Sequence, residues 1–318
     1  MLIRNSHKFT DSFYLLTIGS TCHYIVGHNE FASIDFCASM QLPLYQRRLN
    51  AIGLRLQDIK SVFLTHLDFD RVGAIPYLKE LSPDIRVYGS EAMLKLLEDK
   101  SYCQKIYEED KSYLLSGSLP EMPEPMDFNR YQNNLRITNI VKKSDLLSIS
   151  NVASLRMIDM PGHTSHSVAY FVNPHQFLIV DEGFGYFNGR DLCAPGGDYS
   201  LDLATQSVES TKDLDLRGIG LPSAGFVTGA LIRKHLDGVI SNTRDLLSEC
   251  ESAFIDGVEP EEIKAAVWES FYSTQDFDHI ARRNRTKTFE MVWAQIHQKI
   301  QSAPQGDSAN HFREQARK

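Results

Sequence analysis

Short runs of apolar residues, interrupted by polar turn residues, fill the first two-thirds of the chain and predict β-strands. The runs are rich in β-branched and aromatic residues, and glycine and asparagine separate them. Strands are expected at residues 13–18, 22–26, 31–35, 59–64, 146–150, 154–158, 168–172 and 177–180. Several of these strands end in clusters of polar residues, which is where open sheets usually carry their chemistry.

Helical patterns follow some of the strands and dominate the last third of the chain. Helices are expected at 44–52, 74–81, about 230–250, 260–271 and 286–300. Residues 90–130 are predicted to be a helical and then loop-like insertion near the site, because Pro123 and Pro125 break regular structure. The pattern predicts an α/β domain over 1–228, a C-terminal helical extension over 229–302 and a frayed polar tail over 303–318.

Composition narrows the class of protein. The chain has 318 residues, of which 42% are hydrophobic, so it can bury one large core or two smaller ones. Its net charge of -8 and the absence of a dense basic surface argue against a nucleic-acid partner. We expect no membrane partner, because no apolar run spans a bilayer and the polar N-terminus lacks a signal-peptide core. Five scattered cysteines without a CxxC pair predict a reducing, cytoplasmic setting.

Three polar clusters carry the candidate chemistry. The first, residues 65–73, follows a predicted strand and opens a predicted helix. In it His66, Asp68 and Asp70 alternate, so in an extended turn their side chains would converge on one cation. Imidazole and carboxylate ligands together suit zinc, manganese or iron.

The second and third clusters also lie at strand ends. His163 follows a Pro-Gly turn, and Asp181 and Glu182 close the strand at 177–180. A single histidine at a strand end is more often a hydrogen-bonded structural residue than a ligand. Three such clusters in this order are a much stronger signal.

The sequence around these clusters resembles the metallo-β-lactamase superfamily. The run LNAIGLRLQDIKSVFLTHLDFDRVGAI, residues 49–75, is similar to the segment that leads into the HxHxDH motif of that family. DMPGHTSHSVAYFV and FLIVDEGFGYF resemble its second and third motifs. The resemblance covers roughly residues 13–225. It implies an αββα sandwich with the site at one edge of the two sheets.

Carried over residue by residue, the resemblance implies a rewritten metal motif. His66 and His163 match metal-ligand histidines of the family, Asp68 stands where a second histidine is expected, and the bridging carboxylate falls on Asp181 or Glu182.

Two of the remaining positions of the motif have lost their metal ligands. Asp70 matches the family's aspartate, but Arg71 replaces the last histidine of HxHxDH, and Ala224 stands where the final histidine ligand would be. A guanidinium cannot become a metal ligand. We therefore predict at most one metal ion, with Arg71 in the space of the second and paired with Asp70 and with Asp181 or Glu182.

Three functional hypotheses remain open. In the first, a single-metal hydrolase cleaves an ester, thioester or lactone, with Asp70 orienting the water and Arg71 stabilising the oxyanion. The second is a mononuclear iron oxygenase similar to persulfide dioxygenases, with His66, His163 and a carboxylate as ligands. In the third, the protein is a metal-free pseudoenzyme that binds a ligand.

The helical extension resembles that of family members that act on acyl or quinolone-type thioesters. In those proteins the extension caps the active-site mouth or forms a dimer. We therefore expect a small-molecule substrate, and an apolar C-terminal extension makes a homodimer through these helices a further expectation.

Overall fold

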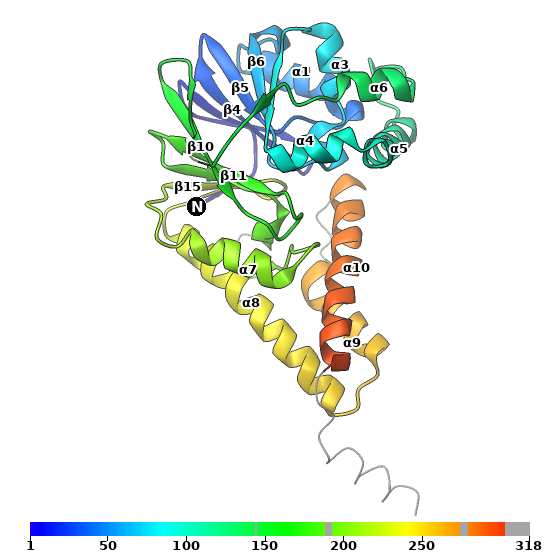
Figure 1. Cartoon of the computed structure of the whole chain (residues 1–318). Helices are drawn as coiled ribbons and strands as arrows, with labels where there is room; N and C mark the ends of the chain where they lie inside the picture. Colours follow the sequence, from blue (N-terminus) through cyan, green and yellow to red (C-terminus); the bar gives the residue numbers. More distant parts are fainter. Residues whose placement is uncertain (144, 188–192, 274–278, 303–318) are drawn as a thin grey trace, which may run out of the picture. The chain divides into compact units, whose positions relative to one another are not determined.

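The structure is a computed structural model that describes residues 1–143, 145–187, 193–273 and 279–302 (Figure 1). It divides into two compact units. Unit 1 comprises Met1–Met160, His166–Asp181 and Leu214–Ile232, and unit 2 comprises Pro161–Ser165, Glu182–Asp213 and Arg233–Lys318. Unit 2 thus combines the predicted helical extension with two segments of the predicted first domain. The predicted frayed tail, 303–318, lies outside the described residues.

Unit 1 contains two seven-stranded sheets. Along the first sheet the order is β2 (His7–Thr10), β3 (Phe13–Ile18), β4 (Thr21–His28), β5 (Glu30–Ile34), β6 (Ile59–Phe63), β7 (Arg86–Gly89) and β8 (Asn139–Ile140). Strands β2 to β5 pair antiparallel, whereas β5 to β8 pair parallel. The four strands predicted in this region are confirmed, with ends that differ by at most two residues, whereas β2, β7 and β8 were not predicted.

The second sheet has the order β1 (Leu2–Ile3), β16 (Gly225–Thr228), β15 (Gly218–Leu221), β12 (Phe177–Ile179), β11 (Val168–Asn173), β10 (Ala153–Asp159) and β9 (Leu146–Ile149). The predicted strands at 146–150, 154–158, 168–172 and 177–180 are confirmed as β9 to β12. Strands β9, β10, β11 and β12 form an antiparallel meander, and β12 pairs parallel with β15.

Aromatic side chains from both sheets form the core of unit 1. The ring of Phe13 on β3 packs edge-on against Phe177 of the second sheet, with ring centroids 4.9 Å apart, and Phe226 lies against both. Tyr24 on β4 is buried, and its hydroxyl lies within hydrogen-bond distance of the carbonyls of Leu221 and Gly225, at 2.8 and 2.9 Å. Aromatic burial and cross-sheet hydrogen bonds therefore hold the two sheets together.

The helices of unit 1 gather beside the sheet that contains β4, β5 and β6 (Figure 1). They are α1 (Leu42–Ala51), α2 (Phe69–Val72), α3 (Ile75–Leu81), α4 (Glu91–Glu98), α5 (Lys100–Ser116) and α6 (Phe128–Asn134). The predicted helices at 44–52 and 74–81 correspond to α1 and α3. The predicted insertion at 90–130 is helical in α4 and α5 and then becomes a loop, as expected from its prolines.

Unit 2 is mainly helical. It contains the strand pair β13 (Tyr186–Phe187) and β14 (Cys193–Ala194), with the helices α7 (Leu201–Ser210), α8 (Ala230–Ile255, whose first turn belongs to unit 1), α9 (Pro260–Val267) and α10 (His279–Ser302). A π-helical turn, Trp268–Tyr272, follows α9. The apolar core of unit 2 includes Leu246, Val267, Phe289, Val292 and Ile296. Among the residues described, no helix combines the length and the apolar character needed to cross a bilayer.

Candidate metal centre

Two parallel strands of unit 1 carry their following residues to the same edge of the sheet. Ile34 of β5 lies opposite Phe63 of β6, so the segments that follow these residues leave the sheet side by side. Asp35 donates its main-chain N–H to the Phe63 carbonyl at 2.8 Å and has a φ of 57°. Aspartate tolerates this left-handed conformation better than most residues do. The turn directs Asp35 towards the Thr65–His66 segment.

Thr65 connects Asp35 to His66 by hydrogen bonds. The carboxylate of Asp35 accepts from the Thr65 main-chain N–H at 2.8 Å and from its hydroxyl at 2.7 Å. The same hydroxyl lies 2.9 Å from Nδ1 of His66. All three residues are buried.

These bonds fix the tautomer of His66. The Thr65 hydroxyl has one proton, which goes to the Asp35 carboxylate, so the hydroxyl oxygen must accept from Nδ1–H of His66. In the neutral imidazole, Nε2 then carries the lone pair. A carboxylate that fixes the tautomer of a histidine, here through a threonine hydroxyl, is typical of the residues that surround metal ligands.

Asp68, the second candidate ligand of the first motif, is the N-cap residue of helix α2. Its main-chain carbonyl accepts from Arg71 and Val72 at 2.9 and 3.2 Å, whereas its side chain makes no capping hydrogen bond. Burial and the charge of Asp68 raise the pKa of Tyr102 on α5. Tyr102, within the 90–130 insertion, therefore lies close enough to Asp68 to be affected by its charge.

Asp70 and Arg71 lie inside α2 rather than in an extended turn, so the alternation that the sequence suggested ends at Asp68. Their side chains form an ion pair at 3.5 Å, and each side chain is only 1–2% exposed. Nη2 of Arg71 also donates to the carbonyl of Pro222 at 3.3 Å. Pro222 belongs to the turn between β15 and β16 that contains Ala224. The guanidinium therefore reaches the turn where the resemblance expects the final metal ligand.

The charge of Arg71 affects its neighbours. His23 on β4 is fully buried, and burial together with the positive charge of Arg71 lowers its pKa to about 3. His23 therefore stays neutral near neutral pH, and Arg71 supplies the positive charge in this part of unit 1.

The loop between β10 and β11 carries His163. Within it Gly162 and His163 offer their carbonyls to the N–H groups of Tyr199 and Ser200 at 2.9–3.1 Å. Gly162 has a φ of 156°, and a Cβ there would overlap the main chain of Ala204 on α7. This turn therefore requires glycine, and it seats His163 against the start of α7.

Two carboxylates flank the His163 ring. Asp198 Oδ1 lies 3.4 Å from Nδ1, and Glu182 Oε2 lies 3.7 Å from Nε2. All three side chains are at most 6% exposed. Glu182 opens a short 3-10 helix directly after Asp181, which is buried at the end of β12. Of the two predicted carboxylates, Glu182 thus contacts His163, a candidate ligand.

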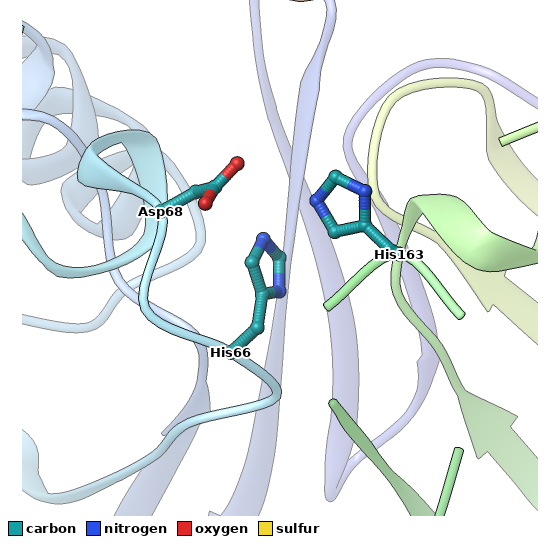
Figure 2. Close-up of side chains that lie close together, drawn as sticks. All are labelled: His66, Asp68 and His163. Carbon is teal, nitrogen blue, oxygen red and sulfur yellow. The ribbon is translucent and has the colours of Figure 1, made fainter. Parts of the chain in front are cut away.

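His66, Asp68 and His163 each offer one ligand atom, and these atoms all lie within 4.8 Å of one another. Figure 2 shows both imidazoles with a ring nitrogen turned towards the space that they share with the Asp68 carboxylate. Two imidazoles and one carboxylate suit zinc, manganese or iron(II). The tautomer of His66 leaves Nε2 available for such a bond. The donor set therefore fits a divalent metal ion.

The sequence alone did not reveal two residues that support this set, Asp35 and Asp198. Asp35 follows a predicted strand, so its position at a strand end was a usable signal. Asp198 lies in a Gly-Gly-Asp loop before α7, and nothing in its local sequence links it to His163.

Comparison with known proteins establishes the family. A model described as the metallo-beta-lactamase superfamily matches residues 34–216, which is more than half of the chain. The protein belongs to this superfamily, whose members are generally metal-dependent hydrolases. The predicted fold class, an α/β sandwich of the αββα kind with a helical C-terminal extension, is confirmed.

Solved structures show the same fold at low sequence identity. A metallo-beta-lactamase family protein from Thermus thermophilus has a TM-score of 0.63 and 16% identity, covering 92% of this chain and 95% of that one. A superfamily protein from the archaeon Sulfolobus tokodaii has a TM-score of 0.54 and 17% identity, covering 91% and 99%. At these identities the likeness establishes the fold alone.

A short stretch matches a curated protein more closely. Over 46 residues the chain is 50% identical to Ribonuclease J of Mycobacterium tuberculosis (strain CDC 1551 / Oshkosh). The match covers 14% of this chain and 8% of that protein. Such a small share of that relative carries no activity over to this chain.

Proposed function

We propose that this protein is a single-metal hydrolase that cleaves an ester, thioester or lactone bond in a small molecule. His66, Asp68 and His163 would hold the metal ion. Arg71 would take the place of a second ion. The observation that carries this proposal is the convergence of three ligand atoms within 4.8 Å.

The position of Arg71 supports a single ion. Its guanidinium lies 3.5 Å from Asp70 and 3.3 Å from the Pro222 carbonyl, and the side chain is 1% exposed. A buried cation there repels a dication and compensates negative charge on Asp70. Ala224, in the same turn as Pro222, has no ligand atom in its side chain.

Each residue of the site has a separate role in the proposed hydrolysis. When bound, a divalent metal supplies the Lewis acidity that lowers the pKa of a water molecule towards neutrality. Asp70 orients the attacking water or accepts its proton. Arg71 holds Asp70 in place and stabilises the negative charge that develops on the substrate oxygen. The Asp35–Thr65 pair keeps His66 in the tautomer that leaves Nε2 available.

A second candidate, a mononuclear iron oxygenase, is favoured by the contact between Glu182 and His163. With Glu182 Oε2 3.7 Å from Nε2, two histidines and this carboxylate approach the ligand set of non-haem iron enzymes. The two candidates differ in the metal they require. A purified protein that holds iron and consumes oxygen with a thiol substrate would favour the oxygenase.

The activity test uses protein stripped by a chelator and then reloaded with zinc, manganese or iron. An aryl ester, an acyl thioester and a lactone are offered as substrates. Hydrolysis should depend on added metal and be lost in His66→Ala. His175→Ala is the control, since His175 is half-buried, contacts Ser12 at 3.1 Å and is not one of the candidate ligands. Hydrolysis that persists in stripped protein would overturn the proposal.

A second test addresses Arg71. The substitution Arg71→His restores the histidine that the family motif has at this position, and we expect metal content to rise from one equivalent towards two. Arg71→Lys keeps the charge and should leave it at one. A wild-type protein that already binds two ions would contradict the replacement of the second ion by Arg71.

A further inference from the structure

A buried chain of polar side chains within unit 2 links helix α10 to His163. Thr288 of α10 donates its hydroxyl to Asp198 Oδ2 at 3.0 Å, and Asp198 Oδ1 lies 3.4 Å from Nδ1 of His163. The hydroxyl of Tyr186 lies 3.0 Å from that of Thr288. All four residues are less than 9% exposed.

The hydroxyl groups of this series of side chains donate in one direction, towards Asp198. The single proton of the Thr288 hydroxyl goes to the Asp198 carboxylate, so Tyr186 must donate to the Thr288 oxygen. Burial and the charges of Asp198 and Glu182 raise the pKa of Tyr186 well above its usual value, so this hydroxyl keeps its proton. Asp198 Oδ1 then faces Nδ1 of His163 at 3.4 Å, an ion-pair contact that does not have the geometry of a hydrogen bond.

Helix α10 also fixes the backbone around Asp198. The side-chain amide of Gln295 donates to the carbonyls of Gly197 and Asp198 at 2.7 and 3.1 Å, and its oxygen accepts from the Leu201 N–H at 2.8 Å. The next two N–H groups after Asp198 hold the backbone of the His163 loop. One helix thus places both the carboxylate and the loop that it faces.

Core packing alone does not require this arrangement. A buried carboxylate costs more free energy than an apolar side chain of similar size unless its partners compensate it. Thr288 donates to Oδ2 of Asp198, whereas Oδ1 faces Nδ1 of His163. Nε2, the other ring nitrogen of His163, faces the candidate metal position. A carboxylate that accepts from Nδ1–H raises the basicity of Nε2 and fixes the orientation of the ring.

We propose that Asp198 is a positioning residue for His163, and that Thr288 of the C-terminal helix holds Asp198 in the orientation that makes Nε2 the metal-binding atom. The helical extension would then contribute to metal affinity itself, in addition to any role as a lid. This inference rests on the proposed single-metal site.

The test compares Thr288→Val with Thr288→Ser. Valine preserves the shape but removes the hydroxyl, whereas serine retains it. Thr243→Val is the matched control, because Thr243 is a buried helical threonine of the same unit that bonds only the Val239 carbonyl, at 2.7 Å. Zinc affinity is measured by competition with a chromophoric chelator, after circular dichroism has verified that each variant is folded.

Thr288→Val should weaken zinc binding by about 10–100-fold, the usual effect of losing an outer hydrogen-bond partner. Thr288→Ser should restore affinity to within a few-fold of wild type, and Thr243→Val should not change it. An affinity of Thr288→Val equal to that of Thr243→Val would overturn the proposal.

A second measurement does not need metal. Long-range nitrogen–proton NMR correlations of the metal-free protein report which nitrogen of neutral His163 carries the proton. We expect Nδ1–H in wild type and Thr288→Ser, and a mixture of tautomers in Thr288→Val. A mixture already in wild type would refute the positioning role. Zinc binding that fails in wild type, with the tautomer fixed as expected, would count against the proposed function and leave the role of Asp198 supported.

Discussion

Asp110, in the middle of α5, should make the stability of unit 1 depend on pH. Its side chain is 1% exposed. Oδ1 accepts from the Ser39 N–H at 2.9 Å, and Oδ2 contacts the Ser39 hydroxyl, which also lies 3.0 Å from the carbonyl of Gly73. The hydroxyl has one proton and cannot donate to both oxygens. A protonated Asp110 resolves this, because Oδ2–H donates to Ser39 and Ser39 donates to Gly73.

The sign of the effect follows from the pKa. Burial raises the pKa of Asp110 from 3.8 to about 7, so the folded protein holds a proton that the unfolded chain has lost between these values. The stability that Asp110 contributes is fully present below 3.8 and is lost as pH rises through about 7. At about 1.4 kcal/mol per pH unit, the loss reaches about 4 kcal/mol. This is a large share of the roughly 5–15 kcal/mol by which folded proteins are typically stable.

The substitution Asp110→Asn tests this reasoning, because an amide mimics the protonated acid. Its oxygen still accepts from the Ser39 N–H, and its nitrogen donates to the Ser39 hydroxyl. The free energy of urea unfolding is followed by circular dichroism between about pH 4 and pH 8. As pH rises, the stability of the variant should increase relative to that of wild type. A difference that stays flat, or that narrows with rising pH, would refute the argument.

Asp99→Asn is the control for that experiment. Asp99 is exposed at the N-terminus of the same helix, and hydrogen bonds from Ser101 lower its pKa. The stability it contributes is present above its unfolded pKa and is lost as pH falls through its folded pKa. The unfolding free energy of the Asp99→Asn variant should therefore not increase relative to that of wild type as pH rises.

Three further predictions concern the metal centre. Thr65→Val should weaken zinc affinity by about 10–100-fold in chelator competition, because it breaks the link from Asp35 to His66, whereas Thr65→Ser should bind almost as wild type. Gly162→Ala should lower the unfolding free energy by at least about 2 kcal/mol in urea titration, since a Cβ there overlaps Ala204; unchanged stability would contradict the close packing of that loop. Removing metal with a chelator should lower Tm by roughly 5 °C or more by calorimetry, and an unchanged Tm would mean that no tightly bound ion was present.

The sequence was a good guide to those elements of the fold that have a strong local pattern. The strand at 13–18 and the helix at 74–81 have clear apolar periodicity, and both were predicted. Strand β7 was missed because it has only four residues and begins with an exposed arginine, so its pairing with β6 is visible only in three dimensions. Helix α7 was missed because it follows a Gly-Gly loop, although Ser200, whose side chain caps it, was a usable signal.

For the site, the motif order pointed to His66, Asp68 and His163, whose possible ligand atoms the structure brings together, since each lies within a few residues of the end of a strand. The role of Asp198 was not predictable, because it depends on contacts with His163 and Thr288 that are 35 and 90 residues away in the sequence. The helical geometry of Asp70 was also missed, because an alternating pattern of acidic residues gives no sign that the chain enters α2 at Phe69.

The proposed function depends on a single metal ion held by His66, Asp68 and His163. Plasma mass spectrometry on protein purified without added metal, and again after soaking with zinc, manganese or iron, tests it most directly. The prediction is close to one equivalent in wild type and in His175→Ala, and far less in His66→Ala. Two equivalents of metal in wild type, or none even after soaking, would show that these residues do not hold a single ion.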